Sequence, residues 1–217
     1  MSTILEFSSV SGKSKRFSLH DVSFKLEEGY IYAITGENGC GKSTLLRYIL
    51  SDKKLYTGVI RVGGEDIIGQ YVRIMNDIGV ISEDNCFLGL CDPVQNGKAL
   101  GVFYDNFDMN RYTELLKQMG ILNCYSYRTM SRGEKIKMQF AFGLSHSPKL
   151  FLMDEPTEGL DPIFKKEFYD TLRHLIAEIG ITVLMVNHNI HEIKFNSDYM
   201  AIMRDGRLEE FHESMEG

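Results

Sequence analysis

Residues 36–43 read Gly-Glu-Asn-Gly-Cys-Gly-Lys-Ser, and this complete G-x-x-x-x-G-K-[ST] motif limits the possible folds more than any other feature of the chain. An apolar run at 31–34 precedes the motif, and a helical pattern at 44–50 follows it. Between a strand and a helix, such a loop turns its backbone N–H groups toward phosphate oxygens, and the helix N-terminus adds partial positive charge. A glycine-rich turn without a ligand is the alternative, but it requires neither the lysine nor the flanking elements. The sequence therefore predicts a strand–loop–helix unit that binds a nucleotide.

The side chains of this loop have separate expected tasks. Lys42 can reach the β- and γ-phosphates, and the Ser43 hydroxyl can bind a magnesium ion. The glycines allow the backbone to approach the phosphates closely. Within this loop and the start of the helix, the residues expected to contact the nucleotide are Gly36, Asn38, Gly39, Cys40, Gly41, Lys42, Ser43 and Thr44.

Two consecutive acidic residues, Asp154 and Glu155, follow the apolar run at 150–153. Such a run is typical of a buried parallel strand that ends at the edge of a site. Asp154 would hold the magnesium ion, usually through a water molecule, and Glu155 could polarise an attacking water as a general base. A strand ending at a solvated acidic turn is the alternative, and the loop at 36–43 favours the nucleotide site.

Ser131 and Glu134 have the S-x-x-E spacing of a capping box at the start of a helical pattern. The helix N-terminus, the Ser131 hydroxyl and Gly133 would then form an anion site. A capped helix without a ligand is the alternative.

The segment 130–134, Met-Ser-Arg-Gly-Glu, resembles the Leu-Ser-Gly-Gly-Gln signature of ATP-binding-cassette (ABC) ATPases, and Ser131 lies 23 residues before Asp154. That interval is usual in the family. Further segments resemble family motifs in the family's order along the chain: the Q-loop approach at 78–83, the D-loop segment at 155–162 and the switch histidine at His188. A weaker likeness, Asn-Phe-Asp at 106–108 before a short amphipathic helix, is to small bacterial exporter-type ATPases.

The resemblance implies an α/β fold for the whole chain, with a RecA-like P-loop NTPase core, an antiparallel β portion and an inserted α-helical subdomain. We expect a single domain over 1–217, with 1–83 and 130–217 as the core and 84–129 as the helical subdomain. Hairpin turns are expected at 63–64 and 205–206. The segment 92–101 carries turn signals, and the acidic stretch 209–213 is interpreted as a solvated end.

The same resemblance implies that the chain binds and hydrolyses ATP with Mg²⁺, using Glu155, His188 and Glu83 in catalysis. Ser131 and Gly133 would contact the γ-phosphate of the ATP held by a partner subunit. This implies a head-to-tail dimer, either a homodimer or a heterodimer with another ABC ATPase. A separate transmembrane permease would provide the transport path, and the resemblance favours export. The alternative is a soluble ABC ATPase that acts on a ribosome, DNA or a protein assembly.

Several positions depart from the family pattern. Arg132 replaces the first signature glycine, and Glu134 replaces the glutamine. Glu83 stands where many relatives have glutamine; a carboxylate remains a good magnesium ligand, so the expected metal ligands are Ser43, Glu83 and Asp154. Cys40 replaces a usual alanine or serine, and its thiol either is unusually reactive or simply fills space.

The residue that stacks on adenine is expected upstream of the phosphate loop. Phe17 is the nearest aromatic candidate, and it could equally be a core residue of the segment 17–26.

The net charge of −6 disfavours a general nucleic-acid binder. The four cysteines have no paired metal spacing, as expected for reduced thiols in the cytoplasm. Apolar runs do not approach the ~18–20 residues that span a bilayer, and the N-terminus lacks a signal-peptide pattern. We therefore expect a cytoplasmic protein, peripheral at the inner face of the membrane, that contacts the membrane only through the permease.

Overall fold

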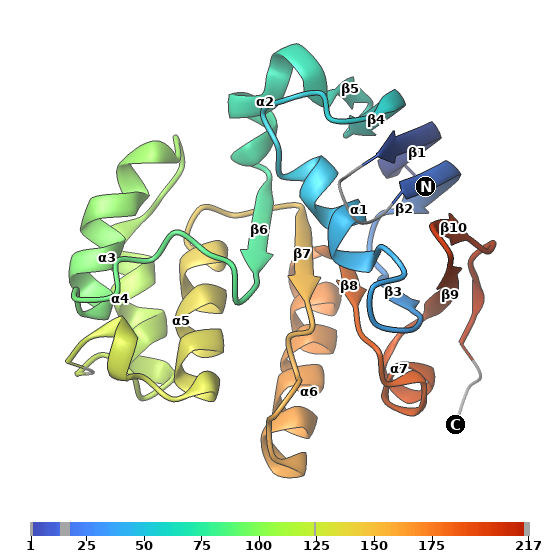
Figure 1. The fold of residues 1–217 in the computed structure, drawn as a ribbon. Coiled ribbons are helices and arrows are strands. Elements are labelled where there is room, and N and C mark those ends of the chain that lie inside the picture. Colours follow the sequence, from blue (N-terminus) through green and yellow to red (C-terminus); the bar gives the residue numbers. More distant parts are fainter. Residues whose placement is uncertain (1, 14–17, 124, 215–217) are drawn as a thin grey trace.

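A computed structural model describes residues 2–13, 18–123 and 125–214 (Figure 1). Within these residues, the larger of two sheets has seven strands. In spatial order they are β10 (Arg207–Leu208), β9 (Tyr199–Arg204), β3 (Ile31–Thr35), β8 (Thr182–Val186), β7 (Leu150–Asp154) and β6 (Ile78–Ile81), with β11 (His212–Glu213) paired to β9. The strands from β9 to β6 are parallel, whereas β10 and β11 run antiparallel to β9.

The parallel strands are mostly apolar, as expected where both faces of a sheet are covered. All five residues of β3 and all five of β8 are buried, as is typical of a parallel sheet between layers. Parallel strands have their carboxyl ends at one edge of the sheet. At this edge the loop at 36–43 follows β3, Asp154 is the last residue of β7, and His188 follows β8, so the topology brings the predicted site together.

A second, antiparallel sheet has the order β2 (Ser18–Glu27), β1 (Thr3–Lys13), β4 (Thr57–Val62) and β5 (Glu65–Asp66). The hairpin expected at 63–64 is confirmed, since β4 pairs with β5 across two glycines with positive φ. The hairpin expected at 205–206 is also confirmed, because β9 pairs with β10 across Asp205 and Gly206. This antiparallel portion beside a parallel core is the α/β fold class that the sequence predicted.

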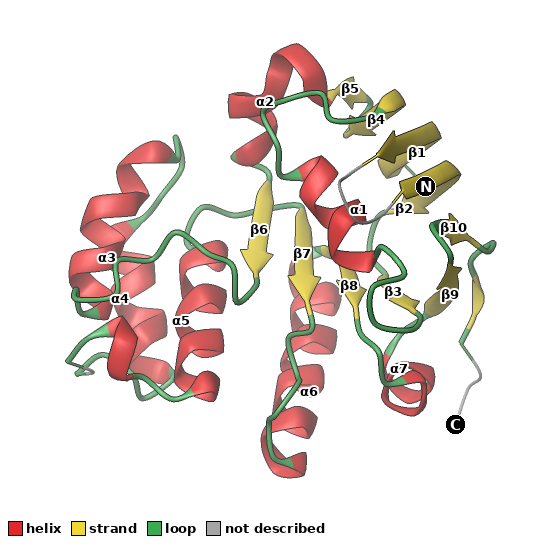
Figure 2. Ribbon diagram, viewed as in Figure 1, coloured by secondary structure: helices red, strands yellow, loops and turns green. Residues whose placement is uncertain are grey.

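The helices form two groups. Figure 2 shows all helices in red and the strands in yellow. Those around the larger sheet are α1 (Lys42–Ile49), α2 (Ile67–Met75), α6 (Pro162–Ile179) and α7 (Ile190–Asn196). Those at the β6 end are α3 (Pro93–Leu100), α4 (Met109–Gln118) and α5 (Arg132–Leu144), with 3-10 turns η1 (Gly101–Phe103) and η2 (Tyr127–Thr129). Figure 1 shows α3, α4 and α5 side by side next to β6.

Alternate residues of the parallel strands face two different cores. Leu152 of β7 joins the core that also contains α1 and the antiparallel sheet. Its neighbours Phe151 and Met153 point to the opposite face, where α6 and α7 pack. A third core lies among α4, α5 and the segment 121–130. Because α5 contributes Phe140 to the second core and Phe142 to the third, it joins the helical group to the sheet.

One local expectation was wrong, and a second was incomplete. The segment 92–101, interpreted as turns, contains α3, because Asp92 caps this helix and Pro93 occupies its first turn. The acidic side chains of the stretch 209–213 are exposed, as expected of a solvated end. The stretch also includes β11, and the Phe211 ring packs edge-on against Phe24 and Tyr32, with centroids 5.5 Å from each. Apolar contact therefore anchors this segment despite its acidic neighbours.

Candidate functional site: the carboxyl edge of the parallel sheet

The phosphate loop connects β3 to α1, and its glycines are required by the backbone. Gly36 has φ +153°, and Gly41, the N-cap of α1, has φ +116°. A Cβ on Gly36 would lie 2.2 Å from the carbonyl oxygen of Met203 and 2.8 Å from the Sγ of Cys40, which is itself buried. Gly41 caps α1 without a side-chain hydrogen bond, so the first N–H groups of the helix have no side-chain acceptor at this cap. This is a suitable anion site.

Lys42 is 5% exposed, and its ammonium group lies against the loop itself. The Nζ atom donates hydrogen bonds to the carbonyl oxygens of Gly36 at 2.7 Å and of Glu37 at 3.1 Å. These bonds hold a positive charge at the loop, where a polyphosphate could take over as acceptor.

Ser43 and Asp154, two of the three predicted magnesium ligands, lie next to each other in space. The Ser43 hydroxyl donates to Oδ1 of Asp154 at 3.1 Å. Burial raises the pKa of the Asp154 carboxyl, and the Ser43 hydrogen bond and the Lys42 charge partly offset this effect. A hydroxyl and a carboxylate are hard oxygen donors that suit Mg²⁺, so the two side chains fit the expected ion.

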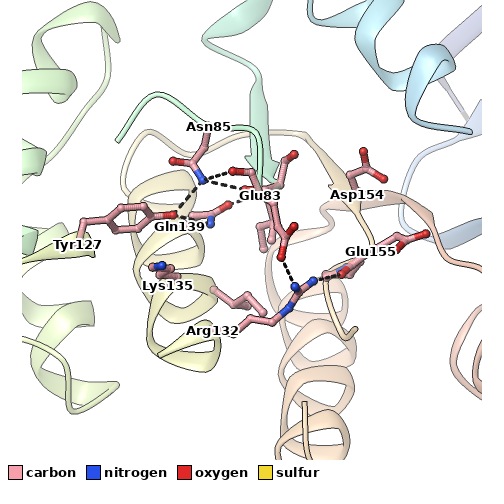
Figure 3. Close-up of a pocket in the computed structure, with 12 residues that line it drawn as sticks. Glu83, Asn85, Tyr127, Arg132, Lys135, Gln139, Asp154 and Glu155 are labelled. Carbon is pink, nitrogen blue, oxygen red and sulfur yellow. Dashed lines mark hydrogen bonds and ion pairs between the residues drawn. The ribbon is translucent and has the colours of Figure 1, made fainter. Parts of the chain in front are cut away.

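Glu83, the third expected ligand, follows β6 and lines the same cavity as Asp154 and Glu155, of about 420 Å³ (Figure 3). Its carboxylate forms an ion pair with Arg132. Glu83 therefore lies at the predicted site, but this carboxylate is already paired with a cation.

Glu155 has an unusual backbone conformation for a residue with a side chain. Its φ is +47°, and its N–H donates to the carbonyl oxygen of Val186 at 2.9 Å. The Nδ1 atom of His188 lies 3.2 Å from its Oε1 atom. The Glu155 carboxyl also hydrogen-bonds Glu158 and raises the pKa of that carboxyl. The two predicted catalytic residues, one after β7 and one after β8, are thus in contact.

The segment after β6 is anchored by a polar network that the sequence analysis missed. The side-chain oxygen of Gln139 in α5 accepts a hydrogen bond from the Ser82 N–H at 2.8 Å, and its amide donates to the Tyr127 hydroxyl at 3.0 Å. Asn85 donates to the same hydroxyl at 2.9 Å (Figure 3). Gln139 is 4% exposed; a glutamine at a buried position of an amphipathic helix was the available signal.

A second missed residue, Glu192 of α7, ties the D-loop segment to the switch segment. Its carboxylate binds the Lys165 ammonium at 2.6 Å and the Tyr169 hydroxyl at 2.9 Å, and it also contacts the Thr157 hydroxyl. The Asn187 amide, beside His188, donates to it at 3.3 Å. The Glu192 side chain is 9% exposed, so this network fixes the segments that carry Glu155 and His188.

The capping box at the start of α5 is confirmed. The Ser131 hydroxyl accepts from the Glu134 N–H at 3.3 Å, and the Glu134 carboxylate accepts from the Ser131 N–H at 2.7 Å. Among the described residues, neither Ser131 nor Gly133 has a hydrogen bond to the loop at 36–43. The structure does not bring these two together with the phosphate loop of the same chain. Phe17, the candidate for stacking on adenine, lies outside the described residues.

Comparison with known proteins agrees with this geometry. The family model described as "ABC transporter" matches residues 19–158. The chain is 29% identical over 211 residues to the Bacillus subtilis ABC transporter ATP-binding protein YhcH, covering 96% of this chain and 69% of YhcH. It is 31% identical over 197 residues to BraG of Pseudomonas aeruginosa, named as a high-affinity branched-chain amino acid transport ATP-binding protein, covering 88% of this chain and 84% of BraG.

Solved structures share the fold. An ATP-binding subunit of an ABC transporter superposes with a TM-score of 0.85 at 23% identity, covering 97% of this chain and 90% of its own. An ATP-binding cassette solved as a dimer in a post-hydrolysis state with ADP and Pi has a TM-score of 0.83 at 22% identity, covering 99% and 100%.

The chain therefore belongs to the ABC transporter family. It is the ATP-binding subunit of an ABC transporter, and like its family it is an ATPase. Of the two classes left open by the sequence, these findings support the transporter subunit rather than the soluble ATPase. Along the part of the chain that the structure describes, we find no helix of sufficient length and apolar character to cross a bilayer.

Proposed function

We propose that this ATPase drives a separate membrane permease through ATP-dependent closure of a dimer, with Glu155 as the general base. The observation that supports this role is the placement of Glu155 directly after Asp154, with its carboxylate against His188. A base next to the metal carboxylate and held by a second residue has the position needed to activate a water molecule.

In this mechanism the remaining side chains bind and orient the nucleotide. Lys42 exchanges its loop carbonyls for the β- and γ-phosphates, and the α1 N-terminus adds its N–H groups. Ser43 and Asp154, assisted by Glu83, would hold Mg²⁺, which neutralises phosphate charge. His188 orients the Glu155 carboxylate through its Nδ1 atom.

The dimer is proposed because Ser131 and Gly133 lie at the start of α5 and not against the chain's own phosphate loop. A helix N-terminus and a serine hydroxyl form an anion site, and in a head-to-tail dimer this site would meet the γ-phosphate held by the second subunit. The partner is either a second copy or another ABC ATPase. The dimeric cassette with ADP and Pi, which has the same fold, supports this arrangement.

We further propose export as the direction of transport, on the likeness of the segment 106–108 and the following helix to exporter-type ATPases. The subunit would then lie in the cytoplasm at the inner face of the membrane, attached through the permease. The division into a core (1–83 and 130–217) and a helical subdomain (84–129) is part of the same proposal. Vesicles that contain the co-purified permease would test the direction, since an exporter moves substrate away from the side that receives ATP.

Mixing two inactive variants tests the shared site. Ser131→Arg on one copy and Lys42→Ala on the other should leave one intact composite site in a mixed dimer and restore part of the ATPase activity. Each variant alone should remain inactive. Verified mixed dimers without recovered activity would contradict a mechanism in which one intact composite site suffices. Where the partner is a second copy, the Glu155→Gln variant should have twice the subunit mass with Mg·ATP and the single mass with ADP; where it is another ABC ATPase, the doubled assembly requires that protein.

A further inference from the structure

Arg132 contacts two loops of its own subunit that carry the proposed catalytic carboxylates (Figure 3). One guanidinium nitrogen, Nη1, forms an ion pair with Oε1 of Glu83. The other, Nη2, donates to the backbone carbonyl oxygen of Glu155 at 3.1 Å and lies 3.9 Å from Oε2 of Glu158. The side chain thus joins the first turn of α5 to the segments that follow β6 and β7.

The local charges explain why a cation is needed at this position. Three carboxylates, those of Glu83, Asp154 and Glu155, line one cavity, and a fourth, that of Glu158, lies 3.9 Å from Arg132. An unpaired Glu83 would add uncompensated negative charge beside Asp154 and the incoming polyphosphate, whereas the ion pair with Arg132 compensates that charge.

The guanidinium also has the shape required for two simultaneous contacts. In the planar fork of the guanidinium, Nη1 contacts the Glu83 carboxylate while Nη2 donates to the Glu155 carbonyl oxygen. The single ammonium nitrogen of a lysine cannot make both contacts in this geometry. The Nε atom is buried without a hydrogen-bond partner in the described chain. The contacts of the two Nη atoms, with Glu83, the Glu155 carbonyl oxygen and Glu158, are therefore the polar interactions that keep this side chain in place.

We propose that Arg132 and Glu83 form a charge-compensated latch, in which Arg132 is a positioning residue for Glu155. The two departures from the signature and Q-loop patterns are then one coupled change and not two independent ones. The latch fixes the backbone of Glu155 and compensates part of the negative charge that Glu83 adds to the proposed metal site. This inference rests on the proposed roles of Asp154 and Glu155.

A double-mutant cycle tests the latch. We would prepare the wild type, Arg132→Gln, Glu83→Gln and the double variant, and measure ATP turnover together with calorimetric Mg·ATP affinity. Arg132→Gln should lower turnover or affinity about tenfold, since contacting pairs in one network couple strongly. Glu83→Gln keeps a side-chain oxygen that can still face the metal, so its own defect should be smaller than that of Arg132→Gln. The double variant should be at least about threefold better than Arg132→Gln, because the unpaired carboxylate has been removed.

Two additional variants separate positioning from a general effect of charge. Lys135→Gln removes a cation from the same cavity, one turn along α5, that forms no ion pair with Glu83. It should show no coupling to Glu83→Gln. Arg132→Lys should be intermediate, since it keeps the charge but loses the fork. The defect of Arg132→Gln should shrink in high salt, which screens the exposed Glu83 carboxylate.

The latch would be refuted by a double variant whose defect equals the product of the two single defects, or by an Arg132→Gln protein as active as the wild type. Equal coupling at Lys135 would refute it as well. Thermal unfolding of all variants identifies any that simply fold poorly. A wild type that neither binds nor hydrolyses ATP would instead contradict the proposed function, so the two failures can be told apart.

Discussion

The Nδ1 atom of His188 lies 3.2 Å from Oε1 of Glu155, so a side chain that follows β8 touches one that follows β7. This contact orients the Glu155 carboxylate. A separate hydrogen bond, from the Glu155 N–H to the carbonyl oxygen of Val186, fixes the backbone of Glu155. A general base held at both its backbone and its carboxylate loses little mobility when a water molecule binds. The rate of ATP hydrolysis should therefore depend more on whether this side chain can accept a proton than on its size.

Replacing Glu155 with Gln should abolish most turnover while leaving Mg·ATP binding intact. A neutral amide cannot accept the proton of the water, and the loss of a general base typically costs on the order of 10²–10⁴-fold. Phosphate release measures turnover, and calorimetry measures binding. Glu158→Gln is the matched control, because this neighbouring carboxylate should be needed much less; near-normal turnover of Glu155→Gln would exclude the assigned base.

Lys42→Ala should weaken ATP binding and the thermal stabilisation that ATP provides. A ligand at a hundred times its Kd stabilises the folded state by about 2.7 kcal/mol, and this increment should fall once the buried cation is removed. Differential scanning calorimetry with and without Mg·ATP measures it. Lys149→Ala, at an exposed lysine paired with Asp77, should retain the full increment. An unchanged ATP affinity in Lys42→Ala would contradict the phosphate-loop assignment.

Gly36→Ala should destabilise the fold by more than about 1 kcal/mol, since a strained φ alone costs on the order of 1–3 kcal/mol. The added Cβ would also meet the Met203 carbonyl oxygen at 2.2 Å, and backbone cannot move aside as a side chain can. Gly89→Ala is the control, because its nearest neighbour would be a side-chain atom at 3.8 Å. Denaturant unfolding compares them; equal stability of the two variants would show that the loop tolerates a side chain.

The stability of the fold should decrease as the pH falls below about 6.5, with His146 contributing to the loss. This residue is 2% exposed and stacks on Tyr104, with ring centroids 4.3 Å apart. Its Nδ1 must carry the proton, since it faces the carbonyl oxygen of Asn76 at 3.0 Å. Burial lowers the pKa of the His146 imidazole, so the folded state favours the neutral form. That stabilisation is present above the unfolded pKa and is lost as the pH drops through the folded value.

Unfolding free energies at pH 7 and pH 5 test the role of His146. His146→Phe retains an aromatic ring but cannot titrate, so its loss between the two pH values should be smaller than that of the wild type. His174→Gln, at an exposed histidine beside Glu178, should leave most of the loss unchanged. An identical pH dependence in His146→Phe and the wild type would remove His146 as a contributor.

The sequence predicted the parallel core well because its motifs are local. The loop at 36–43 and the acidic pair at 154–155 each combine an apolar strand with polar residues at its end, and parallel topology then brings them to one edge. Helix α3 was missed because Asp92 and Pro93 were interpreted as turn formers. The same residues begin a helix: Asp92 accepts from the Gln95 N–H at 2.7 Å, and Gln95 reaches back to the Asp92 N–H at 3.1 Å. The D-x-x-Q spacing was the overlooked signal.

Other contacts had no signal in the sequence. Arg132 and Glu83 are 49 positions apart in the sequence. Neither segment indicates that the first turn of α5 lies in space against the loop that follows β6. The packing of Phe211 was hidden for a similar reason, since three acidic residues surround it in sequence while its aromatic partners belong to β2 and β3. Tertiary packing decided both cases; in the second, the composition correctly indicated exposed acidic side chains but not the packed Phe211.

The contacts of Arg132 also predict which residue pairs at positions 83 and 132 are compatible. An arginine beside a glutamine at position 83 would still donate to the Glu155 carbonyl oxygen, so this pair keeps one of the contacts. A glutamate at 83 beside a glycine at 132 would lack the cation that pairs with it here. Among related ATPases, glutamate at the position of Glu83 should occur with a cation at the position of Arg132, while the arginine should also occur with glutamine.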